Sequence, residues 1–408
     1  MCFSKRIGIT VIGGLTMVSL LLSGIRLQIA TASPKPQIEE PLSLQIWWPD
    51  VFYTENHRDD IDDIFANYNN IDLDIQFYPY VLGDDVRRLS LTKRIAPDAL
   101  PHLTIIREEE LAEAVRNGLV QPIDRWQLEG VLPNLSGMGR VNDIQYGMPY
   151  MFQIQHMVYT PAFNSPPIGL DILQAQEGKM LFPALPITNQ YVNNQFLAQY
   201  LALGGQVRNE DGQPALTRAV LLSLLRFYTD GLERDVFDAG IMNYMSIEDY
   251  RQQITDENKN FAFVPSRYYV ERRQSGQPTL SITPIPNING ESLVIFDGWV
   301  WVLLTDDPDY QDEALRFVQW MTETDRLEKI ATASSLLPNR ESALRVLQVS
   351  PYINFINNLS TDQIFVMPSR PPVNTAAALQ QAFIAVISGN STPEEATTAA
   401  LEMLGQSE

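Results

Sequence analysis

The chain has 408 residues, of which 45% are hydrophobic and 19% are charged, a composition typical of a globular protein with more than one hydrophobic core. This composition excludes a disordered chain, a coiled coil and a multi-span membrane protein. The 29 Lys and Arg residues against 49 Asp and Glu residues give a net charge of -20, so nucleic-acid binding is not expected. The one cysteine is Cys2, so residues 3–408 offer no disulfide, no thiolate nucleophile and no Cys-ligated metal.

The first 32 residues have the layout of a secretory signal peptide. A basic start at Lys5 precedes the uncharged residues 7–25, and a small-x-small pattern ends at Ala32. We therefore expect residues 1–32 to be removed on export, which leaves the Pro-rich residues 33–41 as a linker. The alternative is an uncleaved membrane anchor, because the uncharged stretch approaches the roughly 20 residues that span a bilayer. Either arrangement puts the rest of the chain outside the cytoplasm.

Short apolar runs typical of β-strands alternate with amphipathic segments typical of helices along the rest of the chain. The predicted strands are residues 44–48, 73–77, 103–106, 261–264 and 300–304. Strands that alternate with helices in this way predict an α/β fold with mainly parallel sheets.

Capping residues mark the predicted helix ends. One helix stops at Gly118, a second runs from Thr217 to Gly231, and a third closes at Gly389. The last helix begins with a capping box, in which Thr392 is followed three residues later by a glutamate. The apolar stripes of these helices predict core packing.

Motifs that carry catalysis are missing from the sequence. The 3 histidines, His57, His102 and His156, are far apart and form no metal-binding pair. There is no nucleophile elbow, Walker loop or dinucleotide-binding fingerprint. The acidic run at 59–63 lacks the spacing of a calcium loop and predicts the start of a helix instead. We expect no catalytic residue, no metal site and no cofactor.

Several stretches, in order, carry the motifs of one family. They are 44–49 (LQIWWP), 101–124 (PHLTIIREEELAEAVRNGLVQPID), 146–159 (YGMPYMFQIQHMVY), 201–217 (LALGGQVRNEDGQPALT), 298–321, 336–344 (LLPNRESAL) and 377–401. Together they cover almost all of residues 42–404. The chain resembles the extracellular solute-binding proteins of ABC importers, in the sugar-binding family that includes maltose-binding protein.

The resemblance implies a two-lobed periplasmic-binding-protein-like α/β fold with three interlobe crossings. Lobe one would comprise residues 42–150 plus 292–338, and lobe two 151–291 plus 339–408. The lobes would close by hinge bending around a carbohydrate or similar small polar ligand, and the closed form would dock on a membrane permease. We expect a monomer that breaks no bond. The alternatives are a membrane-tethered ligand-sensing ectodomain and a secreted carbohydrate-active enzyme.

Residues at strand ends are the first candidates for ligand binding, because ligands of open α/β sheets bind beyond the carboxyl ends of strands. Trp47 and Trp48 end the first predicted strand, and Arg107 and Glu108 follow the third. Aromatic rings can cover the apolar faces of a sugar, while charged and amide groups bond its hydroxyls. Neighbours on a strand face opposite sides, so at least one of the two tryptophans is expected to pack internally.

The resemblance adds three candidates, Gln153, Tyr268 and Trp299. Trp299 follows Gly298 and is expected to be partly exposed before ligand arrives. For each candidate the alternative is packing in the core. The segment around Tyr268 reads FAFVPSRYY at 261–269, where the family usually has glycines and a tryptophan. That departure leaves open whether the ligand is a simple neutral sugar.

Overall fold

The structure, a computed structural model, describes residues 42–52, 57–81, 83–123, 126, 130–159, 179–187, 191–237, 239–254, 261–277, 280–346, 350–359, 363–367 and 371–406. The expected signal peptide at 1–32 and linker at 33–41 lie outside these ranges. Within the ranges, no helix is both long enough and apolar enough to cross a membrane.

The longer strands contain or overlap every predicted one. They are β1 (Ser43–Pro49), β2 (Asp72–Tyr78), β3 (Leu103–Arg107), β6 (Gly147–Tyr159), β8 (Phe261–Pro265) and β11 (Ser292–Leu303). The short strands are β4 (Arg140–Val141), β5 (Ile144–Gln145), β7 (Met180–Leu181), β9 (Ser281–Thr283), β10 (Ile285–Pro286), β12 (Leu337–Pro338) and β13 (Ile364–Val366).

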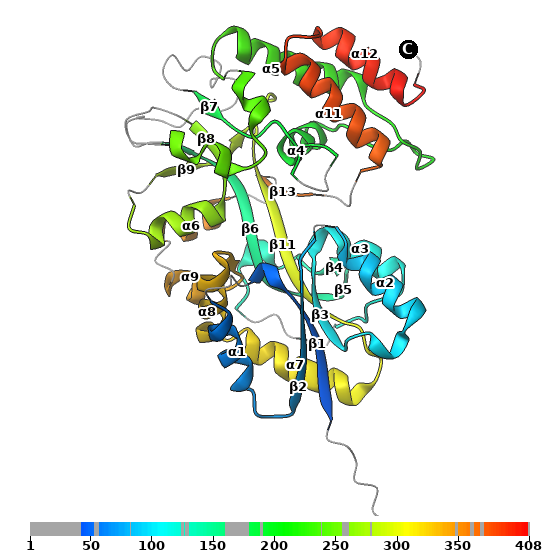
Figure 1. Ribbon diagram of the computed structural model, residues 1–408, viewed down its shortest axis with the longest axis vertical. Coiled ribbons are helices and arrows are strands. Elements are labelled where there is room, and N and C mark those ends of the chain that lie inside the picture. Colours follow the sequence, from blue (N-terminus) through cyan, green and yellow to red (C-terminus); the bar gives the residue numbers. More distant parts are fainter. Residues whose placement is uncertain are drawn as a thin grey trace, which may run out of the picture. The chain divides into compact units, whose positions relative to one another are not determined.

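The main sheet has the strand order β2-β1-β3-β11-β6-β8-β7. β1 pairs with β2 and β3 in parallel, whereas β11 pairs with β3 and β6 in antiparallel. β6 is also antiparallel to β8. The expectation of mainly parallel sheets is therefore wrong. The long strands β6 and β11 run side by side in opposite directions (Figure 1). On their other sides, β11 is antiparallel to β3 and β6 is antiparallel to β8.

Helices gather in two groups at the two ends of β6 and β11 (Figure 1). Beside β1, β2 and β3 lie α1 (Arg58–Ala66), α2 (Asp85–Ile95), α3 (Glu108–Arg116), α7 (Pro308–Met321), α8 (Thr324–Ser334) and α9 (Glu341–Val346). At the other end lie α4 (Asn194–Ala202), α5 (Arg218–Glu233), α11 (Val373–Ile387) and α12 (Pro393–Met403). α6 (Ser266–Gln274) follows β8, and α10 (Ser350–Asn358) bonds to β6 through Tyr352 and His156.

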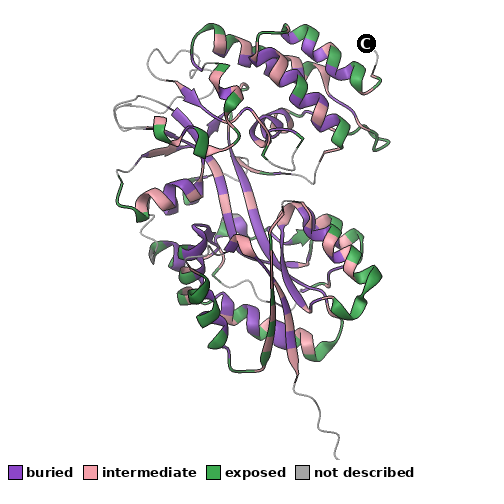
Figure 2. Ribbon diagram, viewed as in Figure 1, coloured by how far each residue is buried: buried purple, intermediate pink, exposed green. Residues whose placement is uncertain are grey.

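Two hydrophobic cores correspond to these two groups. The first contains Trp48, Tyr150, Trp301 and Phe317, and the second contains Phe182, Phe196, Tyr228 and Phe383. The helices bury the faces that turn toward these cores and expose their outer faces (Figure 2). α6 and α10, both within the predicted lobe two, contribute Tyr269 and Tyr352 to the first core. The boundaries of the two lobes stay a prediction.

Local sequence signals decide some of the helix ends. Thr392 and Glu395 form the predicted capping box, with hydrogen bonds of 3.2 and 2.9 Å. The predicted end of a helix at Gly231 is wrong, because α5 continues to Glu233. Gly231 serves packing instead: a Cβ there would lie 2.3 Å from the ring of Phe237.

Candidate functional site

Three strands bring distant residues together at one edge of the sheet. Arg107 ends β3, and Trp299 of β11 lies opposite it in the antiparallel pairing. On the other side of β11, Asp297 pairs with Gln153 of β6. Strand register therefore places the predicted residues Arg107, Gln153 and Trp299 around Asp297.

A buried ion pair occupies this edge. The Arg107 Nη2 donates to Asp297 Oδ1, and Arg107 Nη1 lies 3.3 Å from Glu109 Oε1. The Gln153 Nε2 donates to Asp297 Oδ2 at 3.1 Å. The side chain of Arg107 is only 5% exposed, and those of Asp297 and Glu109 are each 14% exposed. Burial lowers the pKa of Arg107, but the attraction of Asp297 and the other neighbouring groups outweighs it and raises that pKa above its ordinary value.

Two aromatic rings pack against Trp299, which lies opposite Arg107. Phe52, in the short helix Asp50–Phe52 after β1, packs edge-on against Trp299 at 5.8 Å between ring centroids. Tyr80, just beyond β2, packs against the same indole at 6.5 Å. The backbone N–H of Tyr80 donates to Asp50 Oδ1 at 2.6 Å, which holds the tyrosine in place. The ends of β1, β2 and β3 therefore all contribute to one site.

Three buried polar atoms at this site have no hydrogen-bond partner among the described residues. They are the hydroxyl of Tyr80, Nε of Arg107 and Nε1 of Trp299. An unpaired buried polar group costs about 1–3 kcal/mol, so most such groups in folded proteins are paired. We call Tyr80, Arg107, Glu109, Gln153, Asp297 and Trp299 the strand-end cluster.

Two buried acids lie behind the cluster. Asp85 begins α2 and Glu110 lies in the first turn of α3, and they are 3% and 8% exposed. The hydroxyl of Tyr78 donates to Asp85 Oδ1 at 3.4 Å. Burial raises the pKa of both acids, and the negative charge of Asp85 raises that of Glu110 further. Glu110 is therefore the member of the pair that keeps a proton near neutral pH.

Both predicted tryptophans at the end of β1 lie outside the cluster. Trp48 has no exposed surface and packs between Phe52, Phe65 and Trp301 in the first core. Trp47 is half-buried and packs edge-on against Tyr78 at 6.2 Å. Trp299 is 2% exposed, so the expectation that it is partly exposed is wrong. The rings of Phe52 and Tyr80 pack against it.

Glu108 and Tyr268 have other partners. The carboxylate of Glu108 accepts the backbone N–H of Gly139 at 3.0 and 3.1 Å, and burial raises the pKa of Glu108 to about 7. Tyr268 is 4% exposed and lies beneath Arg251, whose guanidinium carbon is 5.8 Å from the ring centroid. Tyr268 and Arg251 line a surface hollow of about 530 Å³, which Glu108 does not reach. Of the seven predicted residues, the structure brings Arg107, Gln153 and Trp299 together.

Asp297, Glu109 and Tyr80 were missing from the sequence prediction. Asp297 could have been found, because strand alternation puts residues two apart on the same side and Trp299 was already a candidate. Tyr80 follows a predicted strand, so the rule applied to the first and third strands also applied to the second. Glu109 lies in a run of three glutamates, and no signal separates it from its neighbours.

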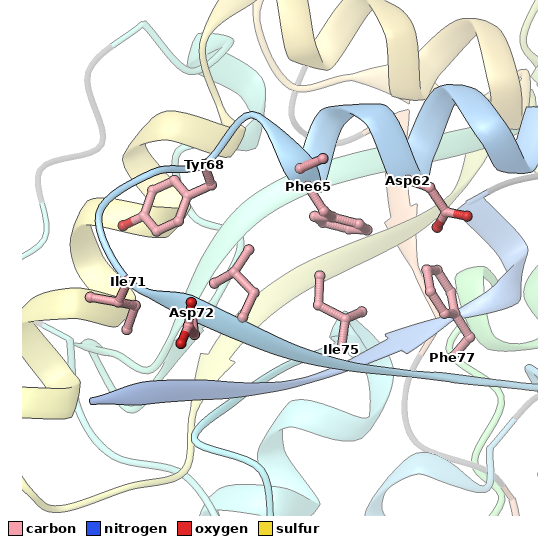
Figure 3. A pocket seen from close by; sticks show the side chains of 9 residues that line it. Asp62, Phe65, Tyr68, Ile71, Asp72, Ile75 and Phe77 are labelled. Carbon is pink, nitrogen blue, oxygen red and sulfur yellow. The ribbon is translucent and has the colours of Figure 1, made fainter. Parts of the chain in front are cut away.

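A second cavity lies between α1 and β2 (Figure 3). Its volume is about 380 Å³, and none of the cluster residues lines it. We call it the α1–β2 groove; its lining residues are Asp62, Phe65, Ala66, Tyr68, Ile71, Asp72, Leu73, Ile75 and Phe77. The side chains of Ile75 and Phe77 on β2 point toward the helix, and the two aspartates lie at opposite sides of the groove (Figure 3). In the part of the chain that is described, no group of three acidic, His or Cys side chains is placed to hold a metal ion.

Comparisons with known proteins agree with the predicted fold. A family model described as bacterial extracellular solute-binding protein matches residues 89–355. No protein with a curated description matches the sequence significantly.

Solved structures give the same result. Maltose-bound MalE3 of T. maritima has 16% sequence identity and a TM-score of 0.65, over 89% of this chain and 99% of that one. An ABC transporter solute-binding protein from Thermotoga lettingae, bound with alpha-D-tagatose, has 17% identity and a TM-score of 0.62, over 89% and 99%. A Listeria monocytogenes ABC substrate-binding protein in complex with cycloalternan has 14% identity and a TM-score of 0.64, over 89% and 98%. The chain therefore has the two-lobed fold of these proteins, as predicted.

Proposed function

Because this chain belongs to the bacterial extracellular solute-binding proteins, we propose that it captures a small hydroxylated ligand, of the carbohydrate class, at the strand-end cluster. One observation carries the choice of this site. The hydroxyl of Tyr80, Nε of Arg107 and Nε1 of Trp299 are buried without partners beside two carboxylates. A ligand with hydroxyl groups would give these three atoms the partners that they lack.

A sugar fits this chemistry because each of its hydroxyls both donates and accepts a hydrogen bond. Nε of Arg107 and Nε1 of Trp299 donate only, whereas the carboxylates of Asp297 and Glu109 accept. Neighbouring hydroxyls of one ring would bond to both kinds of group at once. The unpaired donor atoms are buried, so neighbouring side chains must move for a ligand to reach them.

The neighbouring structures support the carbohydrate class, since they hold maltose, tagatose and cycloalternan. The alternative of a secreted carbohydrate-active enzyme is not favoured, because the family consists of binding proteins. The ligand would be handed over intact to a membrane permease, with the protein acting as a monomer.

A thermal-shift series with maltose, maltotriose and D-tagatose tests the proposal, together with mass spectrometry of any small molecule that co-purifies. A sugar present at 100 times its dissociation constant should stabilise the native protein by about 2.7 kcal/mol. Gln153→Ala should weaken that effect, because it removes a side chain that holds Asp297. Hydrolysis of maltotriose by the pure protein, or no stabilisation by any of the three sugars, would contradict the proposal.

Members of this family act outside the cytoplasm, and we propose that cleavage after Ala32 releases the mature chain. N-terminal sequencing of native protein should then begin at Ser33. A chain that still begins at Met1 in the membrane fraction would favour the tethered sensor instead.

Hinge closure is a further part of the proposal. Solution scattering with a bound sugar should give a smaller radius of gyration than without it. An unchanged profile, with binding confirmed by calorimetry, would indicate a rigid site.

A further inference from the structure

The strand-end cluster contains one fully buried cation and an excess of acids. Arg107 is in contact with two carboxylates, those of Asp297 and Glu109. Asp85 and Glu110 lie just behind it and interact with it electrostatically. Another cation, Arg88, stacks on Tyr78 at 4.0 Å and donates to the carbonyl of Pro79 at 3.3 Å. Arg107 is the cation that pairs with both Asp297 and Glu109.

The carboxylate of Asp297 is held by two donors. Each oxygen of Asp297 has its own donor, Arg107 for Oδ1 and Gln153 for Oδ2. These donors come from β3 and β6, the strands on either side of β11. Glu109 follows β3 on α3 and lies 3.3 Å from Arg107. Asp297 is therefore held from both sides by the sheet itself.

We propose that Asp297 is a specificity-determining residue of the ligand site: it occupies the guanidinium of Arg107, so the site rejects anionic ligands and accepts neutral or cationic hydroxylated ones. This inference rests on the proposed function. An anionic ligand would have to displace Asp297 from a buried ion pair, or place a third negative charge beside Asp297 and Glu109. Both are unfavourable where water is excluded, because like charges repel strongly there. A hydroxyl or an ammonium group can instead donate to the same carboxylates.

Three trisaccharides of matched size test the inference by calorimetry: maltotriose, which is neutral, a glucosamine trimer, which is cationic, and trigalacturonate, which is anionic. The wild-type protein should bind trigalacturonate at least tenfold more weakly than the better of the other two. Asp297→Asn removes one negative charge with little change of volume and should bind trigalacturonate at least tenfold more tightly than the wild type, because Arg107 gains a free partner.

Two further variants keep the test decisive. Glu109→Gln should give a smaller gain in affinity for trigalacturonate. Because Glu109 lies outside β11, this variant still tests the inference if Asp297→Asn lowers the stability of the protein. Glu394→Gln is the matched control, because it removes the partner of Arg226 in an exposed pair 2.6 Å apart. That variant should gain no affinity for trigalacturonate.

The inference is overturned if trigalacturonate binds the wild type as tightly as maltotriose, or if both cluster variants gain nothing for it. The proposed function fails in a different way, when none of the three trisaccharides binds the wild type. In that case, trigalacturonate binding by Asp297→Asn or Glu109→Gln but not by the wild type would still support the inference, and no binding by either variant would overturn it.

Discussion

The strand-end cluster and the α1–β2 groove differ in how their polar and apolar groups are arranged. In the cluster, charged side chains are buried and some of their neighbours have no hydrogen-bond partner. In the groove, the carboxylates of Asp62 and Asp72 are exposed and can be hydrated, while Ile75 and Phe77 provide a half-buried apolar floor. Binding a small polar ligand gains most where buried polar groups lack partners. A polar ligand should therefore gain more from the cluster than from the groove, and four predictions test that contrast.

The largest expected effect comes from breaking the buried ion pair. Arg107→Met leaves Asp297 buried without a cation, which should lower the free energy of unfolding by about 3–5 kcal/mol in urea denaturation. The matched change beside the groove is Arg58→Met, which breaks a pair with Asp62 at 4.0 Å. Because those side chains are 58% and 54% exposed, the loss should be about 0–1 kcal/mol. Equal losses of unfolding free energy in the two variants would show that the strand-end cluster and the α1–β2 groove do not differ in this way.

A pH effect should follow from Glu108, at the start of α3 beside the cluster. Burial raises the pKa of Glu108 from 4.5 to about 7, so the folded state binds more protons than the unfolded state between these values. Stability should therefore fall as pH rises from 4.5 to 7 and then level off, by on the order of 2–3 kcal/mol. Glu108→Gln keeps an acceptor for Gly139 and should gain stability over the wild type as pH rises through that window. Parallel pH profiles for the two proteins would show that Glu108 is not the cause.

Two tyrosines compare an unpaired hydroxyl with a paired one. Tyr80→Phe removes the unpaired hydroxyl of the cluster, so it should raise apo stability by up to about 1–3 kcal/mol and weaken sugar binding by up to about tenfold. Tyr68 lines the groove and donates to buried Glu313. Tyr68→Phe should cost about 1–3 kcal/mol of stability and leave sugar affinity unchanged. Denaturation and calorimetry on both variants measure this contrast, and a loss of affinity only in Tyr68→Phe would reverse it.

The smallest effect is expected on the floor of the groove. Ile75 is half-buried on β2, so Ile75→Thr keeps a β-branched strand residue and should cost less than about 1 kcal/mol. Sugar affinity measured by calorimetry should stay within about twofold of the wild type, within the error of such measurements. A large loss of affinity would mean that the groove, and not the cluster, holds the ligand.

Local patterns along the chain were sufficient to predict much of the fold. Alternating apolar residues identified β2, and the capping box at Thr392 identified the start of α12. Such signals act between residues a few positions apart, so they survive in the folded chain. The predicted helix end at Gly231 was wrong because the role of this glycine depends on Phe237, which packs against it from beyond the helix.

The site could be predicted only in part. The rule about strand ends correctly pointed to Arg107, but it could not tell Trp47 from Trp48 or show that Trp48 belongs to the core. The rule could not pair Arg107 with Asp297 either, because they are 190 residues apart in the sequence.

The order of motifs along the sequence therefore indicated the family and, through that resemblance, the two-lobed fold. Helix periods, strand alternation and caps indicated the individual elements, because these are local properties. The tertiary structure alone decided that Arg107, Gln153 and Asp297 meet while Trp48 is buried elsewhere. The physical reason is the register of β11 between β3 and β6. Packing across the whole sheet sets that register, and a shift of one residue would turn every side chain of β11 to the opposite face.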